Sequence, residues 1–289
     1  MTRFVQCAGK RLDLSEPRIM GVINVTPDSF SDGGRLMPAE PDLPRILDTA
    51  LAMLSEGVAI LDVGGESTRP GAAPVPEDEE TRRVMPVLER LLELDTIVSV
   101  DTRKPGLAAR ALAAGVHMIN DVTGGREAAL VAAVADTGAA LCLMHMQGEP
   151  RTMQLAPSYQ DVVAEVHAFL RRQVDACRRA GMADERLLVD PGFGFGKTLE
   201  HNLALLRHLD EIRVDDLALL VGLSRKGMIG ALTGREVSRR GVGSAAAPQL
   251  AAARGADVVR VHDVAETADA LKMLAAVGPW PRTEGKGAG

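Results

Sequence analysis

The 289-residue chain has few aromatic residues, which make up 2% of it although 46% of the residues are hydrophobic. Leu, Val, Ile, Ala and Met must therefore fill the core, and this favours layered aliphatic packing over an aromatic-rich β-sandwich. The length suits one domain as well as two, because an α/β barrel commonly uses about 250 residues for a single domain.

Cysteine and net positive charge are also scarce. Cys7, Cys142 and Cys177 lie far apart without a C-x-x-C spacing, so the sequence indicates neither a disulfide framework nor a zinc site. The formal net charge is -6, which argues against a general surface for nucleic acid or anionic membrane. Any site for an anion must then be local.

Long hydrophobic runs are missing as well. No apolar run approaches the roughly 18 residues of a membrane span, and residues 1–20 lack the apolar segment of a signal peptide. Together with the unpaired cysteines, this leads us to expect a cytoplasmic protein without membrane contact.

Short apolar runs bounded by Gly, Asp or Asn recur along the whole chain instead. They lie at residues 18–25, 59–63, 97–100, 116–119, 140–144, 186–189, 217–221 and 257–261. Segments with helical periodicity separate them, such as 43–55, 77–93, 105–114, 159–180, 200–209 and 264–276. Nearly continuous apolar strands are typical of a parallel sheet that is buried on both faces. The order of elements is thus β, α, β, α throughout.

Repeated βαβ units with right-handed crossovers close most simply into a (β/α)8 TIM barrel, and a doubly wound open sheet is the alternative. Residues 4–14, with a turn at Ala8-Gly9-Lys10, predict an N-terminal β-hairpin that closes the bottom of the barrel. We expect one domain over residues 1–277 and a disordered tail over 278–289, which is rich in Gly and Pro.

Polar residues follow nearly every predicted strand, and in a barrel these positions face one shared mouth. They are Asn24, Asp62, the run 66–71, Asp101, Asn120, Asp121, His145, Asp190, the run 191–197, the run 224–226, Arg260 and His262. Each of these residues, taken alone, is explained more simply as a helix cap or a turn residue. Their recurrence around the barrel favours a binding site.

The residues at the mouth fall into two chemical groups. Asp101, Asn120 and Asp190 offer oxygen atoms to a flat heterocycle that donates hydrogen bonds, such as an aminopyrimidinone edge. Arg69, Lys226, Arg260 and His262 carry or can acquire positive charge, which suits a phosphate or diphosphate. One ligand with both features would satisfy the whole set.

These stretches resemble the dihydropteroate synthases, pterin-binding enzymes of the folate pathway. The resemblance covers residues 19–272 and is carried by GVINVTPDSFSDGG, ILDVGGESTRPGA, SVDT, INDVTGG, LMHMQGEPRTMQ, LVDPGFGFGKT, LVGLSRKGMIG and ADVVRVHDV. It implies a (β/α)8 barrel, usually a homodimer, that joins 6-hydroxymethyl-7,8-dihydropterin diphosphate to 4-aminobenzoate and releases diphosphate with the help of Mg²⁺. Sulfonamide mimics of aminobenzoate are expected to compete.

The resemblance also implies roles for individual residues. The residues similar to the family's pterin site are Asp101, Asn120, Met144, Asp190, Gly222 and Lys226. Those similar to its diphosphate site are Asn24, Arg69, Arg260 and His262, with Asn24 also the protein's ligand to Mg²⁺. Those similar to its 4-aminobenzoate site are Phe30, Thr68, Pro70, Phe195 and Ser224. Asp101, Lys226, Arg260 and His262 are the catalytic candidates.

Two rival functions share part of this pattern. A pterin-binding methyltransferase with a corrinoid partner would keep the pterin acids but would not need NVTPDSFSDGG or GGESTRPGA, both of which are present. A silent paralogue should have lost a diphosphate residue, yet Asn24, Arg69, Lys226, Arg260 and His262 are all in place. Pro248 falls within residues 244–250, where relatives generally continue a helix that we associate with the dimer contact, so it leaves the expectation of a dimer less secure than that of the fold.

Overall fold

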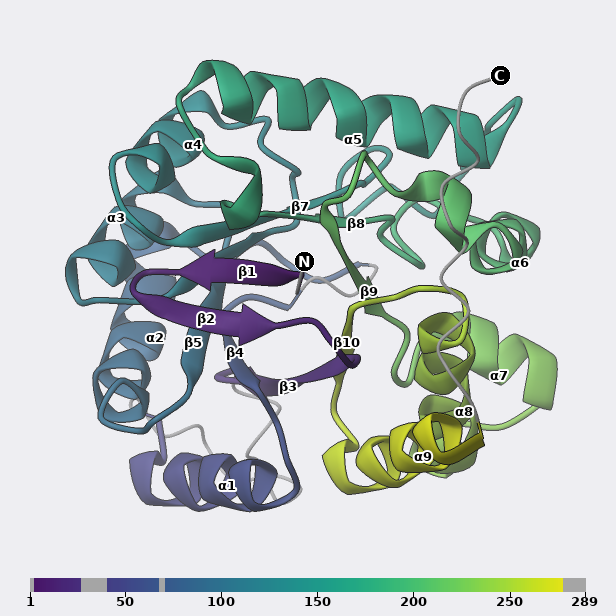
Figure 1. Cartoon of the computed structure of the whole chain (residues 1–289), viewed down its shortest axis with the longest axis horizontal. Coiled ribbons are helices and arrows are strands. Elements are labelled where there is room, and N and C mark those ends of the chain that lie inside the picture. The colour runs from purple at the N-terminus through teal and green to yellow at the C-terminus, as the bar shows by residue number, and fades with distance from the viewer. Residues whose placement is uncertain (1–2, 27–40, 68–70, 278–289) are drawn as a thin grey trace.

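The protein closes eight parallel strands into a barrel with helices around it (Figure 1). The computed structural model describes residues 3–26, 41–67 and 71–277. The barrel strands are β3 (Arg18–Asn24), β4 (Ile60–Gly64), β5 (Ile97–Asp101), β6 (Met118–Asp121), β7 (Ala140–Met144), β8 (Leu187–Asp190), β9 (Ala218–Gly222) and β10 (Val258–Val261). Because β10 pairs with β3, the sheet has no open edge, which confirms the barrel and excludes the open sheet.

Helices alternate with these strands as the periodicity predicts. They are α1 (Leu43–Ser55), α2 (Glu77–Leu91), α3 (Pro105–Ala113), α4 (Ala128–Ala135), α5 (Val162–Arg179), α6 (Leu199–Arg207), α7 (Gly227–Thr233), α8 (Gly241–Ala252) and α9 (Val264–Val277). Short 3-10 turns lie at η2 (Asp184–Arg186), η3 (Leu209–Ile212) and η4 (Val237–Arg239). Helices α7 and α8 both lie between β9 and β10, so this connection has one helix more than the simple repeat.

The sequence of α5 shows why these segments are helical. The carboxylate of Asp161 accepts hydrogen bonds from the backbone N–H groups of Val163 (3.0 Å) and Ala164 (3.1 Å) and so caps the first turn. Val166, Leu170 and Val174, four residues apart, are fully buried toward the barrel.

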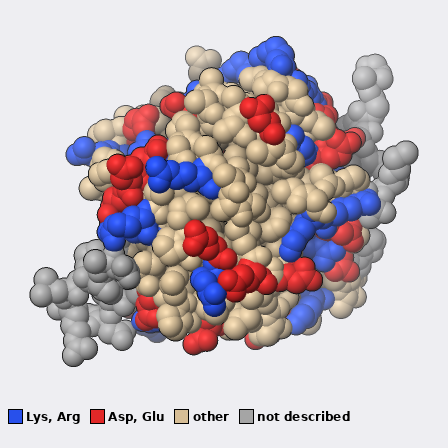
Figure 2. Space-filling model, turned by 90° about the vertical axis from the view of Figure 1, so that its left-hand side faces the viewer, with Lys and Arg blue, Asp and Glu red and all other residues tan. Residues whose placement is uncertain are grey.

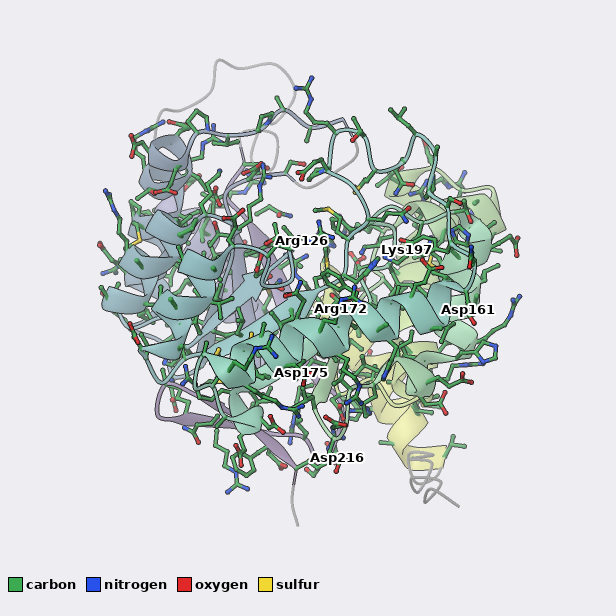
Figure 3. All side chains as sticks on the ribbon, turned by 90° about the horizontal axis from the view of Figure 1, so that it is seen from above. Arg126, Asp161, Arg172, Asp175, Lys197 and Asp216 are labelled. Atoms are coloured by element: carbon green, nitrogen blue, oxygen red, sulfur yellow. The ribbon has the colours of Figure 1, made fainter. Side chains whose placement is uncertain are left out.

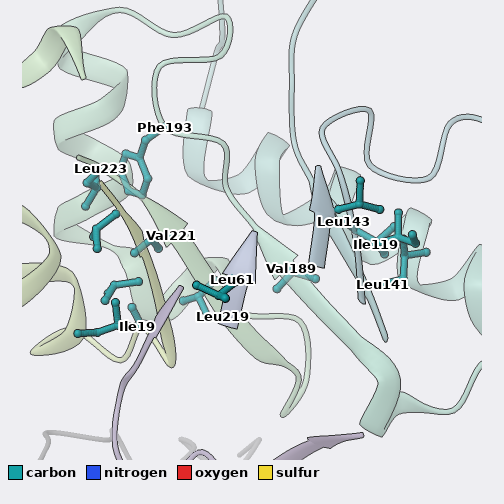
Figure 4. Packing of buried hydrophobic residues seen from close by; sticks show 14 of the residues in the cluster. Ile19, Leu61, Ile119, Leu141, Leu143, Val189, Phe193, Leu219, Val221 and Leu223 are labelled. Atoms are coloured by element: carbon teal, nitrogen blue, oxygen red, sulfur yellow. The ribbon is translucent and has the colours of Figure 1, made fainter. Parts of the chain in front are cut away.

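Strand side chains alternate between two cores. Leu61, Val189 and Val221 belong to the core between the barrel and its helices (Figure 4). Ile60 and Met118 belong to a second core inside the barrel, next to its N-terminal end. Inside the barrel the apolar layer gives way to polar side chains toward the C-terminal strand ends, which is where the site lies.

An N-terminal hairpin closes the bottom of the barrel, as predicted. Strands β1 (Phe4–Cys7) and β2 (Lys10–Asp13) pair antiparallel, and Ala8 (φ 46°) and Gly9 (φ 88°) form the turn. Positive φ at both central residues is the geometry that matches the twist of a two-residue hairpin. The apolar face of the hairpin packs into the interior core of the barrel.

The outer surface over α2 and α3 mixes both signs of charge (Figure 2). Acidic residues fill the first turn of α2, where the helix dipole favours them. Arg82 pairs with Glu79 at 2.7 Å on the same helix, with side-chain exposures of 49% and 31%. Such exposed pairs contribute little to stability.

Helix α8 continues through Pro248. A proline inside a helix removes one backbone hydrogen bond and costs about 3 kcal/mol. Pro248 is buried, so packing against the neighbouring elements offsets this cost.

His117 supports the lower part of the barrel and should make stability depend on pH. Its Nδ1 accepts a hydrogen bond from the N–H of Val98 at 3.1 Å, so the ring is neutral in the fold. Burial, with Lys10 adding to it, lowers the pKa of His117 below its usual 6.5. Because the pKa of His117 is lower in the folded state than in the unfolded state, the neutral ring contributes its full stabilisation above about pH 6.5. The free energy of unfolding then falls as the pH drops from there through the pKa of the folded state.

His117→Asn should weaken this dependence, because the asparagine Oδ1 also accepts the Val98 hydrogen bond and does not titrate. Urea unfolding at pH 8 and pH 5.5 should show a smaller loss on acidification in the variant, by up to about 1.4 kcal/mol for each unit by which the pKa is lowered. The exposed His208→Asn serves as the control. Equal losses in His117→Asn and the wild type would contradict the assignment.

Candidate functional site

The strand ends of the barrel bring together a compact set of polar side chains. Within the described residues, every candidate from the sequence lies at this mouth, on β3, β5, β6, β7, β8, β9 and β10 or directly after them. Phe30, Thr68, Arg69 and Pro70 lie outside the described residues.

Arg260 is the centre of the set. Its Nε donates to Asp62 Oδ2 at 2.6 Å, and its Nη2 donates to Asp101 Oδ2 at 2.8 Å. Such charged hydrogen bonds in a buried place orient the guanidinium strongly. The acidic group and the cationic group expected from the sequence are therefore in direct contact.

Asp101 combines burial with this contact. Burial raises the pKa of Asp101 to about 7, although the Arg260 guanidinium pulls it down, and the charges of Asp62, Glu80 and Asp121 add to the rise. A carboxyl with such a pKa exchanges its proton near neutral pH.

Asn24, Gly64 and Asp101 lie at paired positions of three neighbouring strands. A Cβ at Gly64 would lie 3.9 Å from Asn24 Oδ1 and 3.9 Å from Asp101 Oδ2. Both oxygen atoms therefore face the same small region above a residue that has no side chain. Within the described residues, no cluster of three His, Cys, Asp or Glu side chains is arranged to hold a metal ion.

On the opposite wall, the β8–α6 loop (residues 191–198) surrounds Asp190. Asp190 is buried, and its Oδ1 accepts a hydrogen bond from the N–H of Gly192 at 2.7 Å. Burial raises the pKa of Asp190, while Lys226 lowers it. Lys226 donates to the carbonyl of Phe193 and lies 4.7 Å from the centre of the Phe195 ring. Burial lowers the pKa of Lys226 to about 8, and Asp190 opposes this.

Gly222 leaves room between two cations. A Cβ at this position would lie 3.8 Å from Lys226 Nζ and 3.9 Å from the Cβ of Arg260. Any side chain there would occupy space next to both.

Met144 belongs to a small apolar cluster at the mouth. The cluster consists of Val122, Met144, Met146 and Met153, with Phe195 packed against it. It provides a flat-sided apolar wall beside the polar residues, as a planar ligand requires.

His262 and Ser224 contact each other at the other side of the mouth. The Oγ of Ser224 lies 3.2 Å from His262 Nδ1 and accepts the His262 backbone N–H at 3.3 Å. Ser224 itself is buried. The two residues, assigned to different substrates by resemblance, are therefore neighbours.

Lys197 is a functional candidate that the sequence analysis did not assign. It is 3% exposed, and its ammonium lies 2.9 Å from His145 Nδ1, 2.9 Å from the carbonyl of Gly192 and 3.0 Å from that of Phe195. Burial lowers the pKa of Lys197 well below its usual value and that of His145 to about 2. Figure 3 shows Lys197 on one side of α5, with Asp216 on the opposite side of that helix.

Asp62 is the second residue without an assigned role. It is fully buried in β4 and contacts both Arg260 and Asn120. A signal was present in the sequence, because a carboxylate interrupts the apolar run ILDVG at a position that faces into the barrel.

Comparison with known proteins agrees with this geometry. Residues 20–262 match the family described as pterin binding enzyme. The dihydropteroate synthase of Escherichia coli (strain K12) is 49% identical over 277 residues, which cover 96% of each chain. Among solved structures, the Xanthomonas albilineans dihydropteroate synthase with 4-aminobenzoic acid has a TM-score of 0.88 and 49% identity, covering 96% of this chain and 98% of that one. The Burkholderia cenocepacia dihydropteroate synthase complexed with 7,8-dihydropteroate has a TM-score of 0.86 and 44% identity, covering 96% of both.

Proposed function

Because this chain belongs to the pterin-binding enzymes as a dihydropteroate synthase, we propose that the mouth of its barrel holds both substrates in the way set out below. The enzyme condenses 6-hydroxymethyl-7,8-dihydropterin diphosphate with 4-aminobenzoate to give 7,8-dihydropteroate and diphosphate. The contact of Arg260 with Asp101 and Asp62 is the observation that carries the proposal, because it joins the acidic and the cationic ends of the site.

The pterin lies against the acidic wall. Asp190 and Asp101 accept hydrogen bonds from its ring N–H groups, Asn120 presents its amide, and Lys226 donates to a ring acceptor. Met144 packs on the flat face of the ring, and the missing side chain at Gly222 leaves room for it. The burial of these polar groups makes each unpaired one costly, and this favours a ligand that pairs with all of them.

The diphosphate lies beside the cations. Arg260 and His262, together with Arg69, bind its oxygens, and Asn24 would provide an oxygen to Mg²⁺. The donor set fits this ion, because Mg²⁺ is held by few protein oxygens and takes its other ligands from water and substrate phosphates. When bound, Mg²⁺ neutralises charge on the diphosphate.

The 4-aminobenzoate lies near Phe195 and Ser224, with Phe30, Thr68 and Pro70 as the other proposed contacts. Phe195 offers a ring face for the arene, and the Lys226 ammonium 4.7 Å from that ring attracts its π-electrons. Sulfonamides that mimic 4-aminobenzoate compete for the same place.

Loss of diphosphate leaves a positive charge on the pterin methylene, and the site stabilises this charge. The C–O bond breaks with its electron pair on the diphosphate, the arylamine nitrogen forms the C–N bond, and that nitrogen loses a proton. The Asp101 carboxylate stabilises the cation, while Arg260, His262 and Lys226 stabilise the growing anion. Charged side chains that are already held in place stabilise the transition state more than the bound substrates, because the opposite charges develop only there.

The direct test mixes purified protein, Mg²⁺, the pterin diphosphate and 4-aminobenzoate and measures 7,8-dihydropteroate and diphosphate. Equal amounts of both products are expected. Release of diphosphate without 7,8-dihydropteroate would contradict the proposed arylamine site, and absence of both would contradict the proposed arrangement as a whole.

We also propose that the enzyme acts in the cytoplasm as a homodimer. Among the described residues, no helix combines the length and the apolar character that crossing a bilayer requires. Helices α7, α8 and α9 lie next to one another (Figure 1). Apolar side chains are exposed on these helices and on η4. They are Leu232, Val237, Val242, Leu250, Met273 and Val277. An apolar surface of this kind favours a second copy of the chain as its partner.

Val242→Asp should shift the dimer toward the monomer, because the charge falls on a side chain that is 87% exposed in one chain. Sedimentation equilibrium at micromolar concentration measures this. Leu155→Asp, 82% exposed and before α5, is the matched control and should leave the dimer intact. A wild-type protein that sediments as a monomer would overturn the proposal.

A further inference from the structure

Asp62 lies beneath the proposed substrate site and contacts two of its residues. It is fully buried in the middle of β4, one layer below the strand ends. A single oxygen, Oδ2, accepts hydrogen bonds from Arg260 Nε at 2.6 Å and from Asn120 Nδ2 at 3.1 Å. The strands that carry these two residues, β10 and β6, do not neighbour each other in the barrel.

The contact with Asn120 determines how its amide is turned. A carboxylate only accepts hydrogen bonds, so the NH₂ group of Asn120 must face Asp62. The Asn120 carbonyl oxygen then faces away from Asp62. The amide presents an acceptor in that direction, which is what a ring N–H of the pterin needs.

The contact with Arg260 has a similar effect. Asp62 takes the Nε–H and Asp101 takes one N–H of Nη2, so one edge of the guanidinium is held within the protein. The remaining N–H groups, on Nη1 and Nη2, are directed by this fixed edge. The guanidinium plane is thereby set before any ligand binds.

The arrangement leaves two polar atoms unsatisfied beneath the site. Within the described residues, Asp62 Oδ1 has no hydrogen-bond partner, and neither has Ser99 Oγ at the paired position of β5. A buried polar atom without a partner destabilises the folded state. An aliphatic side chain at position 62 would avoid this in a barrel that needed only stability.

We propose that Asp62 is a positioning residue that sets the Asn120 amide for the pterin and the Arg260 guanidinium for the diphosphate. The inference rests on the proposed function of the site. Asp62 touches neither substrate in this assignment and acts through the two side chains that do.

The test compares Asp62→Asn with Asp257→Asn. Asp257 is the control because it is also a buried carboxylate that pairs with arginine, with Arg3 and Arg213 at 2.7 Å each. It lies at the opposite end of the barrel. Both variants lose a buried negative charge beside arginine, so both lose stability. Among the hydrogen-bond partners of Asp257 are Arg3, Arg213 and the backbone N–H of Leu219, which lie away from the mouth.

Titration calorimetry with 6-hydroxymethyl-7,8-dihydropterin, which lacks diphosphate, measures the effect through Asn120. Inorganic diphosphate with Mg²⁺ measures the effect through Arg260. Asp62→Asn should weaken each affinity about tenfold or more, while Asp257→Asn should leave both unchanged. Wild-type affinities in a folded Asp62→Asn variant would overturn the inference.

The double variant Asp62→Asn with Asn120→Asp tests the hydrogen bond between positions 62 and 120. It also provides a second variant to measure if Asp62→Asn alone does not fold. It exchanges the two groups, so that an amide at position 62 donates to a carboxylate at position 120, which still presents an oxygen to the pterin. The Arg260 Nε–H loses its acceptor in this variant, so only the pairing with position 120 is restored. Pterin affinity should recover most of the loss seen in Asp62→Asn. Affinity no better than that of Asp62→Asn would contradict positioning through Asn120.

The outcomes separate the inference from the function on which it rests. A wild-type protein that makes no 7,8-dihydropteroate contradicts the proposed function, whatever the variants do. A wild-type protein with normal turnover beside an Asp62→Asn variant with normal affinities contradicts only the role of Asp62.

Discussion

Arg260→Ala should lower kcat/KM for the pterin diphosphate at least about a hundredfold and reduce the free energy of unfolding by about 3–5 kcal/mol. The activity falls because the diphosphate loses charged hydrogen bonds, each worth about 1.5–3 kcal/mol. The stability falls because Asp62 and Asp101 remain buried without their counter-charge. The diphosphate role that resemblance implied for Arg260 leads to the first effect, whereas the second follows from the contacts in the structure.

The pH dependence of the stability loss identifies its cause. Burial already raises the pKa of Asp101 to about 7 in the presence of Arg260, and removal of the guanidinium raises it further. A carboxyl whose folded pKa is raised destabilises the fold increasingly as the pH rises toward that value. Urea unfolding should therefore show a larger loss for Arg260→Ala at pH 8 than at pH 5.

Arg225→Ala is the control for this experiment. Arg225 pairs with Asp263 nearby, but its side chain is 48% exposed, so its loss should cost less than about 1 kcal/mol. If Arg260→Ala lost no more stability than Arg225→Ala and kept its rate, Arg260 would not be the centre of the site.

The fold was predictable because its signals are local. Each strand of the barrel is a short apolar run, and the eight predicted runs each overlap the observed strand to within about three residues at either end. The hairpin was predictable from its turn, although Lys10, taken as part of the turn, begins β2. In a parallel barrel the C-terminal ends of all the strands then lie at one mouth.

The contacts inside the site were not predictable from local signals. Asp62 and Arg260 lie 198 positions apart in the chain, and Lys197 and His145 lie 52 apart. By residue type, Asp101 was placed in the group for the heterocycle and Arg260 in the group for the diphosphate. In the structure the two side chains form an ion pair, because buried opposite charges pair with each other even without a ligand. Resemblance supplied roles for the residues that we propose to contact the substrates, and it left out Asp62 and Lys197.

Lys197 links two loops of the mouth. It rests between the carbonyls of Gly192 and Phe195 and the ring of His145, while Tyr159 donates to the carbonyl of Gly196 at 2.9 Å. The loop after β7 and the loop after β8 are thereby tied together. This same β8–α6 loop directly follows Asp190 and carries Phe195.

Lys197→Met should therefore lower the free energy of unfolding by about 3–5 kcal/mol and raise KM for 4-aminobenzoate severalfold. The methionine keeps most of the length and apolar packing of the lysine stem. It leaves the Phe195 carbonyl and His145 Nδ1 without their lysine partner, each at a cost of about 1–3 kcal/mol, while the Gly192 carbonyl still accepts the Phe195 N–H at 3.1 Å. Urea unfolding measures the stability, and initial rates at varied 4-aminobenzoate measure KM. Lys272→Met, at a side chain that is 72% exposed, should change neither.

The two measurements together decide what Lys197 does. If stability fell while KM for 4-aminobenzoate stayed at the wild-type value, the lysine would support the fold without setting Phe195. If both stayed unchanged, the acceptors around Lys197 would have found other partners, and the link between the two loops would not depend on its charge. A raised KM with lowered stability is the expected result, because the carbonyl of Phe195 is held by the same ammonium that ties the loops.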